Sequence, residues 1–146
     1  MEVVVDASVA VKWFVRDAGS ERAIAILDDV GLDLVAPDLF DLEVRNGLLK
    51  QSRLGALNDA LLDRALTELD AVMPRLVSSQ PLLRLATDLA RRAAHPLYDC
   101  LYLALAERLD TTLVTADAAF VARCHQRLAD DPITGRLRDL STPGLP

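Results

Sequence analysis

Short apolar runs alternate with longer helix-like segments along the chain, and this alternation limits the possible folds more than any other feature. The first run, Val3-Val4-Val5, is β-branched and ends at Asp6, which is typical of a strand buried on both faces. Similar short runs predict strands at 34–36, 75–77 and 111–115. Strands that alternate with helices predict a mostly parallel sheet with helices on both faces.

The helices are predicted from apolar residues at helical spacing, from capping residues and from prolines. The predicted helical segments are 9–14, 20–30, 38–51 (weakened by Gly47), 57–73, 81–94, 98–109 and 117–128. Because 146 residues suit one ordinary domain, we expect a single three-layer α/β/α domain over residues 1–146 with a sheet of four or five strands. Prolines and glycines gather in residues 130–146, which predicts an irregular C-terminal tail with one edge strand around 138–140.

The charge of the chain restricts how it could bind nucleic acid. It carries 22 acidic and 16 basic residues, for a formal net charge of −6. Proteins that hold nucleic acid through its phosphates usually have a basic surface. Any RNA binding would therefore need a local basic patch, or cations held by the protein itself.

Other features bear on the compartment. Cys100 and Cys124 lie among apolar residues without a metal-ligand spacing, so we expect reduced, buried thiols. No uncharged run approaches the roughly 20 residues of a membrane span, and no basic stretch precedes an apolar one at the N-terminus. We expect a soluble, cytoplasmic protein that does not associate with membranes.

Four acidic residues occur at or near predicted strand–helix junctions. Asp6 follows the first strand and Asp117 follows the fourth, so their side chains should meet at one edge of a parallel sheet. Glu43 and Asp99 lie on predicted helices. Each acid also has a structural explanation: Asp6 as a turn residue, Asp117 as an N-cap, Asp99 as a first-turn acid and Glu43 as a solvated surface charge.

As a set, these junctions resemble a known family. The segments VVVDAS, EVRN, YDCLYLALAERL and LVTAD, in this order from residue 2 to about 128, resemble the PIN domain and most closely the VapC toxins. The resemblance implies that Asp6, Glu43, Asp99 and Asp117 form one catalytic cluster, which binds one or two Mg²⁺ or Mn²⁺ ions and cleaves RNA. Such ions would relieve the repulsion among the carboxylates, because they prefer oxygen ligands.

The resemblance also implies supporting residues and partners. Ser8, Asn46 and Thr115 would orient ligands, waters or the scissile phosphate. A VapB-like antitoxin would occupy the acidic groove, and the toxin would form a homodimer that joins the antitoxin in a heterotetramer or larger assembly.

Three basic residues lie near the proposed acids in the sequence. Lys12, Arg16 and Arg45 could contact RNA phosphates, or they could be solvated surface charges. The two histidines share no motif with a nucleophile, so we expect His95 to be a loop residue and His125 a helix-surface residue.

Two other functions compete with a metal-dependent ribonuclease. A haloacid dehalogenase-like enzyme would use Asp6 as its nucleophile, but it would need a second Asp where this chain has Ser8. A catalytically inactive PIN-like module would use its acidic groove only to dock a basic partner.

Overall fold

Five strands form one fully parallel sheet in the computed structural model, which describes residues 1–144. The strands are β1 (Glu2–Val5), β2 (Asp33–Pro37), β3 (Arg75–Val77), β4 (Leu113–Thr115) and β5 (Leu137–Asp139). Their order in the sheet is β3-β2-β1-β4-β5. In the parallel register, Val3 of β1 is aligned with Leu34, and Val5 with Val114. The predicted parallel sheet is therefore confirmed.

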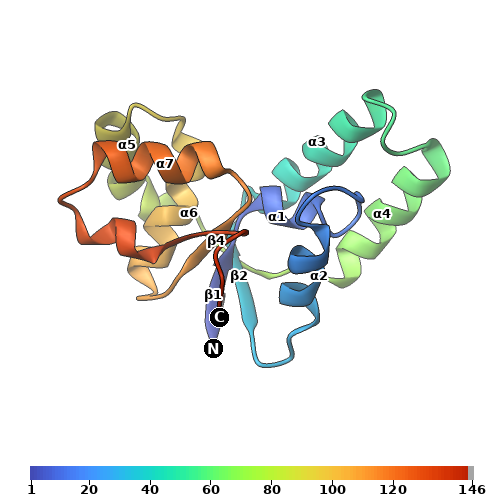
Figure 1. Cartoon of the computed structure of the whole chain (residues 1–146), viewed down its shortest axis with the longest axis horizontal. Coiled ribbons are helices and arrows are strands. Elements are labelled where there is room, and N and C mark those ends of the chain that lie inside the picture. The colour runs from blue at the N-terminus through green and yellow to red at the C-terminus, as the bar shows by residue number, and fades with distance from the viewer. Residues whose placement is uncertain (145–146) are drawn as a thin grey trace.

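Helices cover both faces of the sheet, as predicted. They are α1 (Ala7–Val11), α2 (Ser20–Asp28), α3 (Phe40–Arg53), α4 (Asp59–Ala71), α5 (Leu83–Ala93), α6 (Leu97–Arg108) and α7 (Ala118–Arg127). Figure 1 shows α5, α6 and α7 to one side of the strands and α1 to α4 to the other. Among the described residues, none of these helices combines the length and apolar composition needed to cross a membrane.

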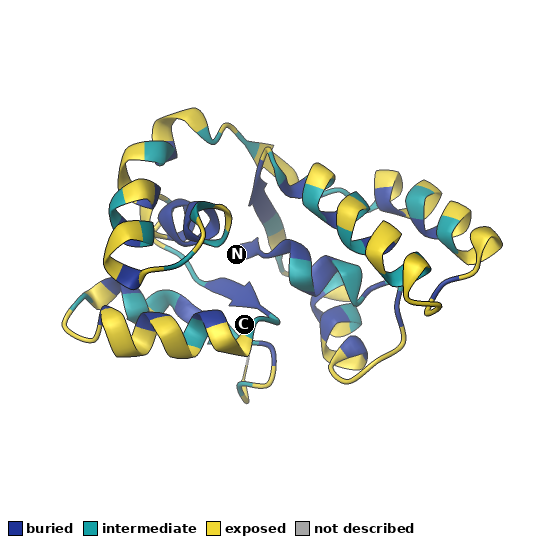
Figure 2. Cartoon of the chain, turned by 90° about the horizontal axis from the view of Figure 1, so that it is seen from above, coloured by how far each residue is buried: buried dark blue, intermediate teal, exposed yellow. Residues whose placement is uncertain are grey.

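The core lies along the central strands and α6. All three valines of β1 are buried, and α6 packs against β1, β2 and β4. Every residue of α6 from Cys100 to Ala106 is buried, which explains why its sequence is apolar on all sides. Figure 2 shows this buried centre between outer helices whose far faces are exposed. The rigid centre fixes the positions of the loops at the ends of the strands.

The prediction of an irregular C-terminal tail was wrong for residues 132–136. Residues Pro132–Arg136 form a 3-10 helix, and the edge strand predicted around 138–140 is present one residue earlier, as β5. The apolar side chains of Ile133, Leu137 and Leu140 are buried, so this segment completes the core. Residues 145 and 146, also part of the predicted tail, lie outside the described residues.

A second difference concerns the start of the helix predicted over 81–94. Pro81 lies in a short 3-10 helix, Gln80–Leu82, and α5 begins only at Leu83. Because proline has no backbone N–H to donate, it is tolerated in this first turn, where the donors have no helical partner.

Gly47 lies where α3 crosses α1. A Cβ atom at this position would lie 2.6 Å from Cγ2 of Val11. The glycine therefore permits a close approach of the two helices, which outweighs its low helix propensity. We expect Gly47→Ala to lower the free energy of unfolding by ~1–3 kcal/mol through overpacking, as measured by urea denaturation.

Two control variants separate this packing effect from a general effect of alanine. A Cβ at Gly135 would meet nothing within 4 Å, so Gly135→Ala should change stability little. Adding Val11→Ala to the Gly47→Ala protein should recover part of the loss, because it removes the methyl group that clashes. A Gly47→Ala protein as stable as the wild type would contradict this account of the helix crossing.

Candidate active site

The candidate site lies where the order of the strands reverses. From β1 the chain first adds β2 and β3 on one side, and it later adds β4 and β5 on the other. In open parallel sheets, such a reversal opens a crevice at the carboxyl ends of the strands. Asp6 directly follows β1, and Asp117 follows β4 as the N-cap of α7. The structure thus places both strand-end acids at the same edge.

Asp6 is buried and held by two hydroxyl groups. Its Oδ2 accepts hydrogen bonds from Oγ of Ser8 at 2.5 Å and from Oγ1 of Thr115 at 2.7 Å. Burial raises the pKa of Asp6 to about 6, although these two hydrogen bonds oppose the shift, and the charge of Asp99 raises the pKa further. Ser8 and Thr115 therefore orient this carboxyl group and join the end of β1 to the end of β4.

Glu43 reaches the site from the first turn of α3. The hydroxyl of Tyr102, on α6, donates a hydrogen bond to Oε2 of Glu43. Burial raises the pKa of Glu43 to about 7; the hydrogen bond from Tyr102 opposes this shift, while the charges of Asp6 and Asp99 add to it. The pKa of Tyr102 is itself raised by burial, so the phenol keeps its proton and remains a donor.

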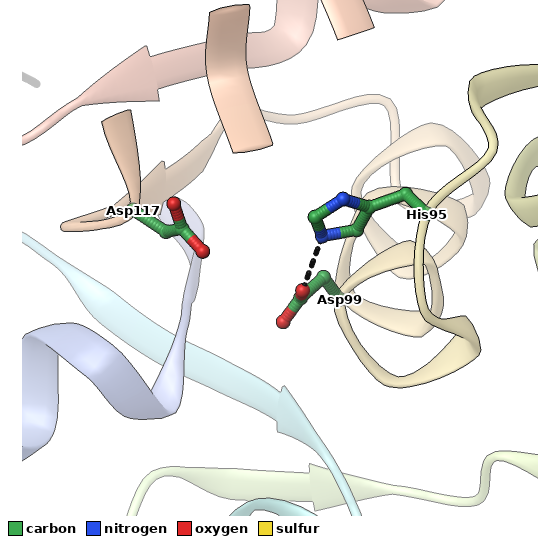
Figure 3. A group of neighbouring side chains, drawn as sticks. All are labelled: His95, Asp99 and Asp117. Carbon is green, nitrogen blue, oxygen red and sulfur yellow. Dashed lines mark hydrogen bonds and ion pairs between the residues drawn. The ribbon is translucent and has the colours of Figure 1, made fainter. Parts of the chain in front are cut away.

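Asp99 and Asp117 face each other beside a histidine. Asp99, in the first turn of α6, has its Oδ2 2.6 Å from Nε2 of His95. One ligand atom from each of His95, Asp99 and Asp117 lies within 4.8 Å of the others. Figure 3 shows Asp117 opposite the bonded pair of His95 and Asp99.

Asp117 was predicted either to cap a helix or to join the acidic cluster, and the structure is compatible with both. Its Oδ1 accepts a hydrogen bond from the backbone N–H of Phe120 at 2.9 Å, so Asp117 caps α7. It also lies in the group with His95 and Asp99. A carboxylate has lone pairs on both oxygens, so capping through one oxygen leaves the other available to a ligand.

The four predicted acids thus come together from four separate segments. The charge of Asp99 raises the pKa of both Asp6 and Glu43, and the charge of Asp6 also raises the pKa of Glu43. Several carboxylates in a half-buried site destabilise one another, and a hard divalent cation with oxygen ligands relieves this repulsion. The donor set of Asp6, Glu43, Asp99 and Asp117 therefore suits such a cation.

Two further predicted residues, Asn46 and Arg45, also lie on α3. Asn46 follows Glu43 by about one turn and is exposed. The guanidinium of Arg45 forms ion pairs with Asp41 at 2.7 Å and with Asp70 at 2.5 Å. The charge of Arg45 is thus balanced by acids outside the cluster, and a role for either residue in RNA contact remains a prediction.

The other two predicted basic residues follow α1. The ammonium group of Lys12 pairs with the carboxylate of Asp17 at 2.8 Å and donates to the carbonyl oxygen of Ala18. Arg16 is exposed, and within residues 1–144 it forms no ion pair. Of the three predicted phosphate contacts, Arg16 therefore has the most accessible charge.

Sequence reasoning missed two residues that touch the acids. His95 does lie in a loop, between α5 and α6, but its ring faces Asp99 instead of lacking a functional neighbour. The spacing of four residues between His95 and Asp99 was the available signal. Tyr102 was hidden in an apolar helix, and its position three residues after Asp99 was the only hint that it shares the site.

The two cysteines are buried, as predicted. Burial raises the pKa of Cys100 to about 12 and that of Cys124 to about 11. Both thiols therefore stay protonated at neutral pH, and neither is suited to act as a nucleophile.

A family model of the PIN domain matches residues 3–125, and the chain belongs to this family. It is similar to Ribonuclease VapC3 of Mycobacterium tuberculosis, at 38% identity over 117 residues, 80% of this chain and 82% of that protein. Ribonuclease VapC3 of Pyrobaculum aerophilum is 34% identical over 119 residues, 80% of this chain and 90% of that protein. The predicted resemblance to VapC-like PIN proteins is confirmed.

A solved structure shares the fold. The crystal structure of PAE2754 from Pyrobaculum aerophilum superposes with a TM-score of 0.64 and 24% sequence identity. The match covers 96% of this chain and 90% of that chain.

Proposed function

We propose that this protein is a Mg²⁺- or Mn²⁺-dependent endoribonuclease that hydrolyses RNA phosphodiester bonds, as the toxin of a VapBC toxin–antitoxin pair. The main support is the convergence of Asp6, Glu43, Asp99 and Asp117 from four segments of the chain. The similar proteins named Ribonuclease VapC3 support the same chemistry and the same class of toxin.

The four carboxylates would hold one or two divalent ions. When bound, such an ion lowers the pKa of a water molecule, orients the phosphate and stabilises the developing negative charge. It would also make an acidic protein attractive to RNA, since the net charge of the chain is −6.

The surrounding residues position these carboxylates before any ligand arrives. Ser8 and Thr115 fix the orientation of Asp6 by donating to one of its oxygens. Tyr102 does the same for Glu43. Preorganisation of this kind is valuable, because a catalytic group misplaced by about 1 Å can cost ~100-fold in rate.

In the metal-free site, burial raises the pKa of Glu43 to about 7. A divalent ion bound at the cluster would favour the charged carboxylate, so we propose that Glu43 acts as an oxygen ligand. The hydrogen bond from Tyr102 to Oε2 would hold this carboxylate in place.

The proposed partners follow from the same surface. RNA and a VapB-like antitoxin would share the acidic groove, and a basic side chain of the antitoxin would pair with the carboxylates. The homodimer, the larger assembly with antitoxin, the single domain over 1–146 and the cytoplasmic location stay predictions.

The function is tested by incubating the purified full chain with single-stranded RNA. We expect cleavage with Mg²⁺ or Mn²⁺, none above background in excess EDTA, and recovery when the ion is restored. Cleavage that persists in EDTA would contradict the metal mechanism. Metal binding without cleavage of any RNA would instead favour the inactive docking module.

A further inference from the structure

We propose that His95 binds the metal ion through Nε2, beside Asp99 and Asp117, and that this imidazole makes the site favour Mn²⁺ over Mg²⁺. The inference rests on the proposed function, because it concerns the same cluster. It goes further in naming a nitrogen ligand and the class of ion that such a ligand selects.

The positions of the three side chains fit a shared ion. Nε2 of His95 lies 2.6 Å from Oδ2 of Asp99, and one ligand atom from each of the three residues lies within 4.8 Å of the others. Two ligands of one ion, at about 2.1 Å each, can be at most roughly 4.2 Å apart. Small side-chain rotations would therefore bring all three atoms to one ion. In Figure 3 the Nε2 edge of the ring faces the two carboxylates.

The fold holds the imidazole ring in this position. The ring lies against that of Phe120, with centroids 4.6 Å apart and an interplanar angle of 33°. Phe120 is 1% exposed, and its backbone N–H donates a hydrogen bond to Oδ1 of Asp117, so the first turn of α7 positions both the ring and the carboxylate. The backbone N–H of His95 is bound to the carbonyl of Ala90 at 3.0 Å. Because its backbone is bonded and its ring is half-buried against Phe120, His95 loses little conformational entropy when it binds an ion.

The identity of the third ligand affects which ion is preferred. Carboxylate oxygens suit both Mg²⁺ and Mn²⁺, so an all-oxygen cluster distinguishes them weakly. Imidazole nitrogen suits transition metals, and Mg²⁺ gains little from it. Coordination requires the lone pair of Nε2, so the proton of the neutral ring is on Nδ1 and the hydrogen bond to Asp99 is exchanged for the shared ion.

Two measurements test the proposal without RNA. Calorimetric titration of the full chain with Mn²⁺ and with Mg²⁺ gives the ratio of the two dissociation constants. Electron spin-echo envelope modulation of the Mn²⁺-loaded protein detects a directly bound nitrogen. We expect Mn²⁺ to bind at least ~10-fold tighter than Mg²⁺, and a ¹⁴N modulation to be present.

Variants assign the nitrogen to one residue. His95→Gln should lose the ¹⁴N modulation and most of the Mn²⁺ preference, while its affinity for Mg²⁺ changes only a few-fold. The matched control, His125→Gln, replaces an exposed histidine on α7 and should retain both signals. Equal losses of Mn²⁺ and Mg²⁺ affinity in His95→Gln would show that His95 only orients Asp99, and would overturn the proposal.

The wild-type spectrum decides the question even if the variant does not fold. Absence of ¹⁴N modulation, or of Mn²⁺ binding, in the wild-type protein would overturn the nitrogen ligand directly. RNA cleavage with metal but without nitrogen coupling would leave the proposed function intact and reject this inference. Nitrogen coupling in a protein that cleaves no RNA would support the nitrogen ligand and reject the proposed function.

Discussion

Replacing Asp99 with asparagine is expected to reduce the rate of metal-dependent RNA cleavage ~100- to 1,000-fold, while the protein still folds. Asp99 contacts His95 and acts electrostatically on both Asp6 and Glu43. Asparagine keeps the size and one acceptor oxygen but removes the charge that a divalent ion requires. Steady-state cleavage of a labelled single-stranded RNA, in saturating Mn²⁺, measures the effect.

The same substitution should leave metal-free stability unchanged or slightly raised. The charge of Asp99 raises the pKa of Asp6 and of Glu43, so its removal relieves repulsion in the metal-free site. Asp59→Asn is the matched control, because Asp59 is an exposed acid in the first turn of α4. A marked loss of metal-free stability in Asp99→Asn would favour a structural role at the start of α6, and near-normal cleavage would reject the catalytic one.

The metal-free protein is expected to be more stable at pH 5 than at pH 8. Burial raises the pKa of Asp6 from 3.8 to about 6 and that of Glu43 from 4.5 to about 7. Between the unfolded and folded pKa values the native protein holds protons that the unfolded chain has released. This stabilisation is complete below about pH 4 and is lost as the pH rises through 6 and 7. Asp6 alone contributes ~1–2 kcal/mol of the difference between pH 5 and pH 8.

Urea unfolding at pH 5, 6, 7 and 8 in EDTA measures this dependence. Saturating Mn²⁺ should remove it, because a bound cation stabilises the charged carboxylates and binds only the folded protein. Glu43→Gln should flatten the upper part of the profile, since it removes the group with the higher pKa. Metal-free stability that stayed constant or rose from pH 5 to pH 8 would contradict the raised pKa values.

The sequence predicted the site best where a local pattern identifies a strand and the sheet topology then fixes the position of the residue that follows it. Val3, Val4 and Val5 form a short run that is apolar and β-branched at every position, which is typical of a strand buried on both faces, and the structure buries all three. Once the sheet is parallel, acids that follow its strands share one edge. The positions of Asp6 and Asp117 could therefore be predicted without knowing any contact.

Contacts between distant segments could not be predicted in this way. His95 is held by Phe120, which lies on another helix, and no local pattern reveals that packing. The guanidinium of Arg45 pairs with Asp41, one turn earlier on α3, but also with Asp70 on α4, and this second pair could not be read from the sequence. Ion pairs and ring packing depend on which helices become neighbours in space, and sequence proximity does not determine that.

The C-terminal tail was mispredicted for a related reason. Its buried residues Ile133, Leu137 and Leu140 are few, and they lie in a segment rich in prolines, glycines and charges, so its composition indicated a loop. They are buried because β5 pairs with β4 and covers the edge of the sheet. Pairing with β4 therefore makes this segment a strand, although its composition is typical of a loop.

The hydroxyl bridge from Thr115 to Asp6 has a consequence for the order in which a ribosome produces this chain. Asp6 leaves the exit tunnel early, but its bonding partner and the last acid of the cluster are translated more than a hundred residues later. A nascent chain that ends before β4 contains Asp6, Glu43 and Asp99 but lacks both Thr115 and Asp117. The cluster is therefore incomplete until β4 and the residues after it have been translated, and we expect a chain truncated before β4 not to show the proposed cleavage.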